Sequence, residues 1–196
     1  MPAVSDVSEV PDDAPEDALT RAKQWIIDFD EAIDSRVDQI RGHRTLDRLM
    51  YAATEVGDWS LLWHTIGFGQ ALLPGRDPMS AVRLSAILGA ESLLVNGGIK
   101  SIFMRHRPVW EEDRPRPHRV RLPQTSSFPS GHASAAFTAA GVLSQGDPLW
   151  PVYYGVAAVV SSSRVYVKMH HASDVIAGAA IGIGVAAIAK RLWRKP

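Results

Sequence analysis

Residues 175–188 read VIAGAAIGIGVAAI, a run of valine, isoleucine, alanine and glycine that ends shortly before Lys190 and Arg191. The hydropathy of this run indicates a helix that crosses a membrane. Its small side chains would let neighbouring helices approach closely, as packing inside a membrane requires. We therefore predict that the stretch is one membrane-spanning helix of a helical bundle.

Four further apolar stretches precede it, separated by short polar breaks. They cover residues 49–73, 81–104, 132–143 and 149–167. The first is weak because Glu55 and Asp58 interrupt it. A bilayer core takes roughly 20 helical residues, so several of these stretches reach full length only with their polar ends included. The pattern predicts an all-α integral-membrane bundle of about five transmembrane helices, and a soluble all-α domain with unusually apolar helices is the alternative.

The N-terminal part of the chain has a different composition. Residues 1–20 contain six acidic residues, three prolines and no basic residue, which predicts a disordered tail. They lack the basic start and apolar stretch of a secretory signal. Apolar residues then recur every three or four positions from residue 19 to residue 40, so we expect an amphipathic helix within residues 21–46. This helix either packs on the domain or lies in a membrane interface. We expect residues 47–196 to form the membrane domain.

Composition excludes several functions. The 196 residues suit one domain plus a tail, and the formal net charge of zero gives no reason to expect nucleic acid as a partner. The chain has no cysteine, so it has no disulfide, no zinc-thiolate site and no thiol nucleophile.

The first cluster of charged residues closes the second apolar stretch. Lys100 is followed after six residues by Arg107 and Pro108. Seven positions make two helical turns, so we expect both cations on one helix face, with Pro108 ending the helix. Two fixed cations would bind one anion. The alternative is an ordinary basic end of a membrane helix.

The second cluster is Pro129-Ser130-Gly131-His132, placed just before an alanine-rich helix. A helix N-terminus presents unpaired amides, and glycine lets an oxyanion approach them. Ser130 adds a hydroxyl donor, and His132 can transfer a proton near neutral pH. The alternative is an ordinary helix cap with an incidental histidine.

The third cluster contains Ser163, Arg164, His170 and Asp174. His170 and Asp174 are four positions apart, so on a helix the carboxylate would accept the imidazole N–H and leave the other ring nitrogen free to attack. Arg164 offers a planar fork for phosphoryl oxygens. The alternative is a salt-bridged helix start, with His171 as a rival partner of Asp174.

Together the three clusters resemble, in order and spacing, the signature of the type-2 phosphatidic acid phosphatase (PAP2) and vanadium haloperoxidase superfamily. The resemblance implies that His170 attacks phosphorus and forms a phosphohistidine, that Asp174 orients it, and that His132 protonates the leaving oxygen and later activates water. It also implies a group of phosphate-binding residues: Lys100, Arg107, Ser130, the Gly131 backbone amide and Arg164. Many membrane members have six spans, whereas this chain offers five.

The resemblance further implies an integral-membrane phosphatase, in a bacterial cell membrane, that needs no metal and no cofactor. Its expected partners are the membrane and a lipid-linked phosphate: phosphatidate, phosphatidylglycerol phosphate, or a polyprenyl phosphate or diphosphate. A vanadate-dependent haloperoxidase and a non-catalytic membrane lipid-binding protein of the same fold are the alternatives. The sequence leaves open the oligomeric state and the side of the membrane on which the site lies.

Overall fold

A computed structural model of the chain describes residues 17–109 and 125–193. All regular elements in these two ranges are helical. The helices are α1 (Ala18–Asp38), α2 (Arg44–Gly57), α3 (Leu61–Ala71), α4 (Met79–Ser92), α5 (Lys100–Ile102), α6 (Gly131–Leu143), α7 (Trp150–Tyr166) and α8 (Ala172–Leu192). A 3-10 turn, η1 (Asp58–Ser60), joins α2 to α3, and a π-helical segment, η2 (Leu93–Ile99), joins α4 to α5. The expected all-α class is confirmed.

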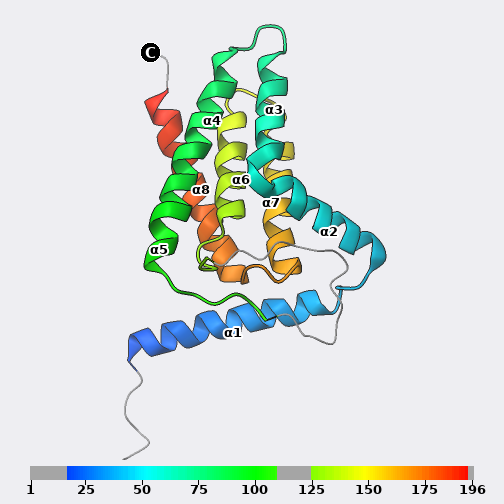
Figure 1. Ribbon diagram of the computed structural model, residues 1–196, viewed down its shortest axis with the longest axis vertical. Helices are drawn as coiled ribbons and strands as arrows, with labels where there is room; N and C mark the ends of the chain where they lie inside the picture. The colour runs from blue at the N-terminus through cyan, green and yellow to red at the C-terminus, as the bar shows by residue number, and fades with distance from the viewer. Residues whose placement is uncertain (1–16, 110–124, 194–196) are drawn as a thin grey trace, which may run out of the picture.

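Helix α6 lies in the middle of the bundle, between α4, α7 and α8 (Figure 1). Its contact with α8 depends on Gly178 and Gly182, which are four positions apart and therefore on the same face. A Cβ atom on Gly178 would clash with the carbonyl oxygen of Ser130, and one on Gly182 with that of Ser134. The close approach expected from the small residues of this stretch is confirmed.

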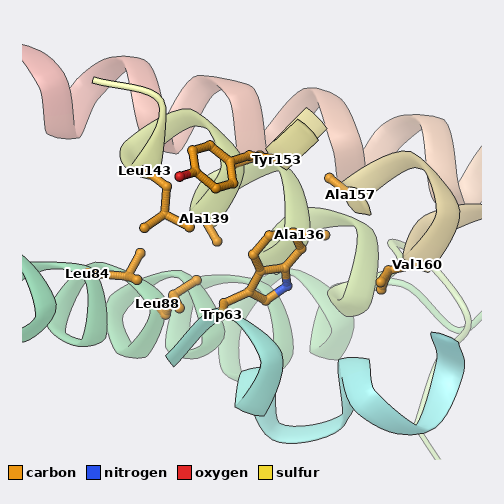
Figure 2. Close-up of a cluster of buried hydrophobic side chains, with 10 residues drawn as sticks. Trp63, Leu84, Leu88, Ala136, Ala139, Leu143, Tyr153, Ala157 and Val160 are labelled. Carbon is orange, nitrogen blue, oxygen red and sulfur yellow. The ribbon is translucent and has the colours of Figure 1, made fainter. Parts of the chain in front are cut away.

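The apolar core centres on Trp63 of α3, which is almost fully buried (Figure 2). Leu84 and Leu88 of α4 and Ala136 of α6 belong to the same cluster. The alanines of α6 leave room for the indole ring, and burial of one large apolar side chain contributes roughly 1.5–3 kcal/mol to the free energy of unfolding. The cluster packs α3, α4, α6 and α7 against one another. It therefore sets the relative positions of helices that surround the site.

The first expected span, residues 49–73, is not one helix, and this prediction is wrong. Helix α2 ends at Gly57, and Trp59 and Ser60 adopt left-handed backbone conformations, with φ of 55° and 56°. These conformations interrupt the helical hydrogen-bond ladder, so α2 leaves the bundle at an angle to α3 (Figure 1). The break turns Asp58 toward the start of α6.

Within residues 17–109 and 125–193, two helical stretches are long and apolar enough to cross a membrane by themselves, Met79–Ile102 and Ala172–Leu192. The first consists of α4, η2 and α5, and the second is α8. The other helices of the bundle are shorter, so the count of five transmembrane helices stays a prediction.

Helix α1 lies across the end of the bundle where α7 ends and α8 begins (Figure 1). Asp17 caps it by accepting a hydrogen bond from the Thr20 backbone N–H at 2.7 Å, so the helix starts inside the expected tail; residues 1–16 of that tail lie outside the described ranges. The helix packs on the domain through Asp30, which is 4% exposed, while Trp25 on another face is 67% exposed.

Candidate active site

The three clusters meet at one end of the bundle. The ends of α5 and α7 and the starts of α6 and α8 lie there together (Figure 1). A cavity of about 520 Å³ opens between them. Six of the eight expected site residues line it: Lys100, Arg107, Gly131, His132, Arg164 and His170. The other two, Ser130 and Asp174, are fully buried behind its wall.

His170 lies in the turn between α7 and α8, where Lys168 adopts a left-handed conformation with φ of 52°. The carbonyl of Arg164 accepts the backbone N–H groups of Met169 and His170, at 2.9 and 3.1 Å, and so fixes the turn. His170 is 2% exposed. Its Nδ1 lies 2.7 Å from the carbonyl oxygen of Ser127, which makes Nδ1 the protonated nitrogen and leaves Nε2 unprotonated.

The position of His170 also sets its charge. Burial lowers the pKa of His170 to about 3, and the guanidinium groups of Arg164 and Arg107 act in the same direction, against the effect of Asp174. The ring is therefore neutral at neutral pH. A neutral imidazole with one unprotonated nitrogen is the form that acts as a nucleophile, and Arg107 Nη1 lies 3.5 Å from that nitrogen, Nε2.

Asp174 does not share a helix with His170, so the expected helical register is wrong. Helix α8 begins at Ala172, and Asp174 stands at its third position, where Oδ2 accepts the backbone N–H of His171 at 2.9 Å. The His170 Nδ1 is 3.7 Å from Asp174 Oδ2, farther than from the Ser127 carbonyl. His171 caps α8 in this arrangement. No residue type could have marked the Ser127 carbonyl as a partner of His170, because every residue presents a carbonyl.

Two residues that the motifs did not indicate hold Asp174 in place. Arg105 donates from Nη1 to Asp174 Oδ1 at 2.7 Å and from Nη2 to Asp30 Oδ2 of α1 at 2.6 Å. Asp30 in turn accepts the Ser173 backbone N–H at 2.8 Å. Asp30 could not be told apart in the sequence from the other acidic residues of its amphipathic helix. Arg105 lies between two motif cations, and its spacing from them does not indicate a role.

Lys100 lies on a helix, whereas Arg107 lies in the extended segment that follows it. The prediction that both residues share one helix face is therefore wrong. The helix ends at Ile102, and Phe103 is already extended, with φ of −104° and ψ of 130°. The Phe103 ring packs on Phe128 at 4.9 Å between centroids. The chain therefore leaves the helix before Pro108. Arg107 is held by the carbonyl oxygens of Met169, Thr125 and Ser126, at 2.6, 3.2 and 3.4 Å.

The Ser130 side chain caps α6 and does not line the cavity. Its Oγ accepts the backbone N–H of Ala133 at 3.4 Å. Gly131, the first residue of α6, does line the cavity, and a Cβ atom there would lie 2.9 Å from Oδ1 of Asn96. The glycine therefore keeps the N-terminus of α6 accessible, and the free amides of a helix N-terminus favour an anion.

His132 is paired with a carboxylate that the sequence marked only as an interruption. Its Nε2 lies 2.8 Å from Oδ1 of Asp58 in η1. Gly57 permits this contact, because a Cβ atom there would lie 3.0 Å from Cδ2 of His132. An imidazole beside a carboxylate can hold and release a proton. The signal that pointed to Asp58 was an acidic residue inside an apolar stretch.

Three cations share the cavity wall with His170. Arg164 is 3% exposed, and its Nε has no hydrogen-bond partner among the described residues. The Nε of Arg107 is also buried and has no hydrogen-bond partner among the described residues. Together with Lys100 and the amides of α6, these groups form a site for one compact oxyanion, because guanidinium groups match phosphoryl oxygens in geometry and charge.

Known proteins share the family signature and the fold of this chain. The family model of the PAP2 superfamily matches residues 80–196. An undecaprenyl-diphosphatase of Sulfolobus acidocaldarius is 45% identical over 62 residues, which cover 31% of this chain and 30% of that protein. The chain thus matches less than a third of the length of this relative.

Two crystal structures share the fold. The transmembrane PAP2-type phosphatidylglycerolphosphate phosphatase from Bacillus subtilis has a TM-score of 0.65 and 25% identity, over 91% of this chain and 87% of that one. Aquifex aeolicus LpxE has a TM-score of 0.65 and 28% identity, over 82% of this chain and 93% of that one. The family model covers more than half of this chain, and the two crystal structures extend the likeness over most of the remaining residues. The chain therefore belongs to the PAP2 superfamily.

Proposed function

We propose that this chain is an integral-membrane phosphatase that removes phosphate from a lipid phosphate monoester or diphosphate through a phosphohistidine on His170. One observation carries the proposal: buried His170, whose Nδ1 lies against the Ser127 carbonyl, lines a cavity whose wall also contains Lys100, Arg107 and Arg164. The names of the relatives support a phosphatase that acts on a lipid.

In the first step, Nε2 of His170 attacks phosphorus and the bond between phosphorus and the leaving oxygen breaks. The ring becomes positively charged as the N–P bond forms. The Ser127 carbonyl at 2.7 Å and the Asp174 carboxylate at 3.7 Å, both beside Nδ1, stabilise that charge. Lys100, Arg107 and the amide of Gly131 stabilise the charge on the phosphoryl oxygens, and Arg164 supplements them.

His132 supplies the proton for the leaving oxygen. In the second step the same ring takes a proton from water, which attacks the phosphohistidine and releases phosphate. Asp58, 2.8 Å from His132 Nε2, stabilises the protonated ring before the first step and again after the second. No step in this scheme requires a metal ion.

The decisive experiment measures inorganic phosphate released by the purified protein in detergent micelles, with chelator present, from phosphatidate, phosphatidylglycerol phosphate and a polyprenyl diphosphate. We expect turnover by the wild type and its near loss in His170→Ala, since other contacts do not replace a nucleophile. His171→Ala is the matched control, because His171 is the neighbouring imidazole but caps α8, and it should keep most of the activity. Unchanged turnover in His170→Ala would refute the mechanism.

A further inference from the structure

Helix α1 contacts the domain along only part of its length. Every residue from 17 to 28 is exposed, whereas Asp30 is buried and several residues after it are half-buried. We call residues 18–27 the N-terminal half of α1. This half has no role in the proposed mechanism, and no described part of the chain covers it. It nevertheless carries four exposed large apolar side chains: Leu19, Trp25, Ile26 and Ile27.

The second half of α1 presents acidic side chains to the domain at intervals of four residues. Asp30 accepts a hydrogen bond from Arg105 at 2.6 Å. Asp34 and Asp38 lie 3.3 and 3.4 Å from Nζ of Lys168, in the turn between α7 and α8. Residues four positions apart share a helix face, so this face of α1 points toward the bundle.

The same face is apolar in the N-terminal half. Ile27 and Ile26 stand three and four positions before Asp30, and Leu19 stands eleven positions before it. These spacings correspond to one and three helical turns. The exposed fractions of Ile27, Ile26 and Leu19 are 44%, 39% and 60%. Along one face of the helix, acidic residues therefore replace aliphatic ones at the point where contact with the bundle begins.

The two candidate membrane spans both end beside Asp30. Arg105 follows the span Met79–Ile102 by three residues, and Ser173 is the second residue of the span Ala172–Leu192. Both donate to the Asp30 carboxylate, Arg105 at 2.6 Å and the Ser173 backbone N–H at 2.8 Å. Helix α1 crosses the bundle at this level (Figure 1). The N-terminal half therefore lies at the height where the spans leave the hydrocarbon of a bilayer.

The composition of the N-terminal half suits that height. Arg21 and Gln24 lie on the side away from Ile26, so the segment has one polar and one apolar side. Trp25 is 67% exposed, and tryptophan is enriched where a membrane meets water. Residues 18–27 contain no acidic residue, but residues 1–17 contain six. Contact with apolar lipid, rather than attraction to anionic lipid, is therefore the expected source of binding.

We infer that Leu19, Ile26 and Ile27 dock on the bilayer around the bundle, at the boundary between its hydrocarbon and its head groups. This inference rests on the membrane setting of the proposed function. The occupant is lipid because the apolar face points to the same side of α1 as the bundle, where the bilayer around the spans begins. The bilayer holds one half of α1 and the domain holds the other. The membrane thereby supports the helix that is linked through Arg105 to Asp174.

The test uses spin labels on the full chain in nanodiscs of phosphatidylcholine. The chain has no cysteine, so one introduced cysteine takes one label. The label at Ile26→Cys is compared with a control at Gln24→Cys, roughly 160° away around the same helix. Ile183→Cys of α8, 49% exposed within a candidate span, is the standard for lipid contact. We expect collisions with oxygen, which concentrates in lipid, to dominate for the labels on Ile26→Cys and Ile183→Cys. Collisions with a water-soluble nickel chelate should dominate for Gln24→Cys.

A second experiment perturbs the surface while the label stays at Leu19→Cys. Ile26→Glu combined with Ile27→Glu places two charges on the apolar face, and charge is costly in hydrocarbon. We expect this pair to move the label from oxygen to nickel accessibility. Thr20→Glu combined with Gln24→Glu adds the same charge on the polar side, and the label should stay in lipid.

The inference is overturned if the labels on Ile26→Cys and Gln24→Cys are equally accessible to nickel, or if the two double variants behave alike. Dipolar coupling between Ile26→Cys labels of two chains would overturn it as well, since a second copy would then cover the face. Nickel accessibility at Ile183→Cys would refute the membrane setting itself. Lipid contact at Ile26→Cys without phosphate release from any lipid would refute the proposed phosphatase activity and leave the docking surface supported.

Discussion

Asp30 and Ser173 are 143 positions apart in the chain and are joined by two hydrogen bonds: the backbone N–H and the hydroxyl of Ser173 donate to the Asp30 carboxylate, at 2.8 and 2.6 Å. Arg105 bonds to the same carboxylate and to Asp174. The amphipathic helix α1 is thus tied to the carboxylate behind the proposed nucleophile. Because α1 lies across the end of the bundle that holds the site, its attachment affects both stability and geometry.

The first prediction concerns this attachment. Asp30→Ala removes the acceptor of Arg105 Nη2 and of the Ser173 backbone N–H and hydroxyl, and loss of one partner of a largely buried ion pair costs about 3 kcal/mol. We expect a lower melting temperature in detergent micelles and a lower kcat, because Asp174 is then less firmly held. Asp28→Ala, on the exposed side of α1, should change the unfolding free energy by less than about 0.5 kcal/mol. Equal melting temperatures for the two variants would contradict the role of Asp30.

The second prediction concerns the pair of Asp58 and His132. Asp58→Asn keeps the size of the side chain but removes the charge that supports a protonated ring. General acid catalysis contributes roughly 10²–10⁴-fold, and it matters most for a leaving group that needs a proton. We expect kcat to fall at least tenfold for an alkyl phosphate and much less for p-nitrophenyl phosphate, whose leaving group departs as an anion. An equal loss for both substrates would show that Asp58 acts in another way.

The third prediction concerns the dependence of stability on pH. The folded pKa of His170 is about 3, below the ordinary value of 6.5, because the ring is buried. Below pH 6.5 the unfolded chain therefore binds a proton that the folded protein does not bind. Stability is fully present above pH 6.5 and is lost as the pH falls toward 3, by up to roughly 1.4 kcal/mol per pH unit for one proton.

The measurement is the melting temperature between pH 7.5 and 4. His170→Ala should lose less stability on acidification than the wild type, and His171→Ala should behave like the wild type. If wild type and His170→Ala lose stability in parallel, the imidazole is not buried in its neutral form.

The fourth prediction concerns the contact between α6 and α8. Gly182→Ala places a methyl group against the Ser134 carbonyl, and such overpacking costs about 1–3 kcal/mol. Gly184→Ala is the matched control on the same helix, since nothing lies within 4 Å of its Cβ position. It should raise the unfolding free energy by about 0.5–1 kcal/mol, because alanine favours a helix. Thermal unfolding of both variants tests the contact, and a stable Gly182→Ala variant would argue against it.

Local properties of the chain were readable from the sequence. Apolar runs and helical spacing predicted the helices, because hydropathy and the 3.6-residue period depend only on neighbouring residues. The small residues of α8 predicted its close approach to α6. The presence of a helix directly after Pro129-Ser130 was readable too, although the cap at Ser130 was only the alternative to a phosphate-binding role. Each of these features is encoded within one or two helical turns.

Features that depend on distant partners were not readable. Two predictions were wrong: a continuous helix over residues 49–73, and a common helix face for Lys100 and Arg107. In each case the chain leaves the helix where tertiary contacts outweigh local propensity. The contact of Phe103 with Phe128 draws one segment out of its helix, and the break at Trp59 and Ser60 turns Asp58 toward His132.

The sequence by itself determined that the chain forms apolar helices and carries a set of basic, histidine and acidic residues in the order of one superfamily. Only the tertiary structure decided which atom faces which: that the Ser127 carbonyl lies nearer His170 than Asp174 does, that Arg105 links Asp174 to α1, and that Glu91 lies in the wall of the cavity. The reason is physical. Residue types and spacings are properties of a linear chain, whereas the partners of a buried polar group are set by the packing of helices far apart in sequence.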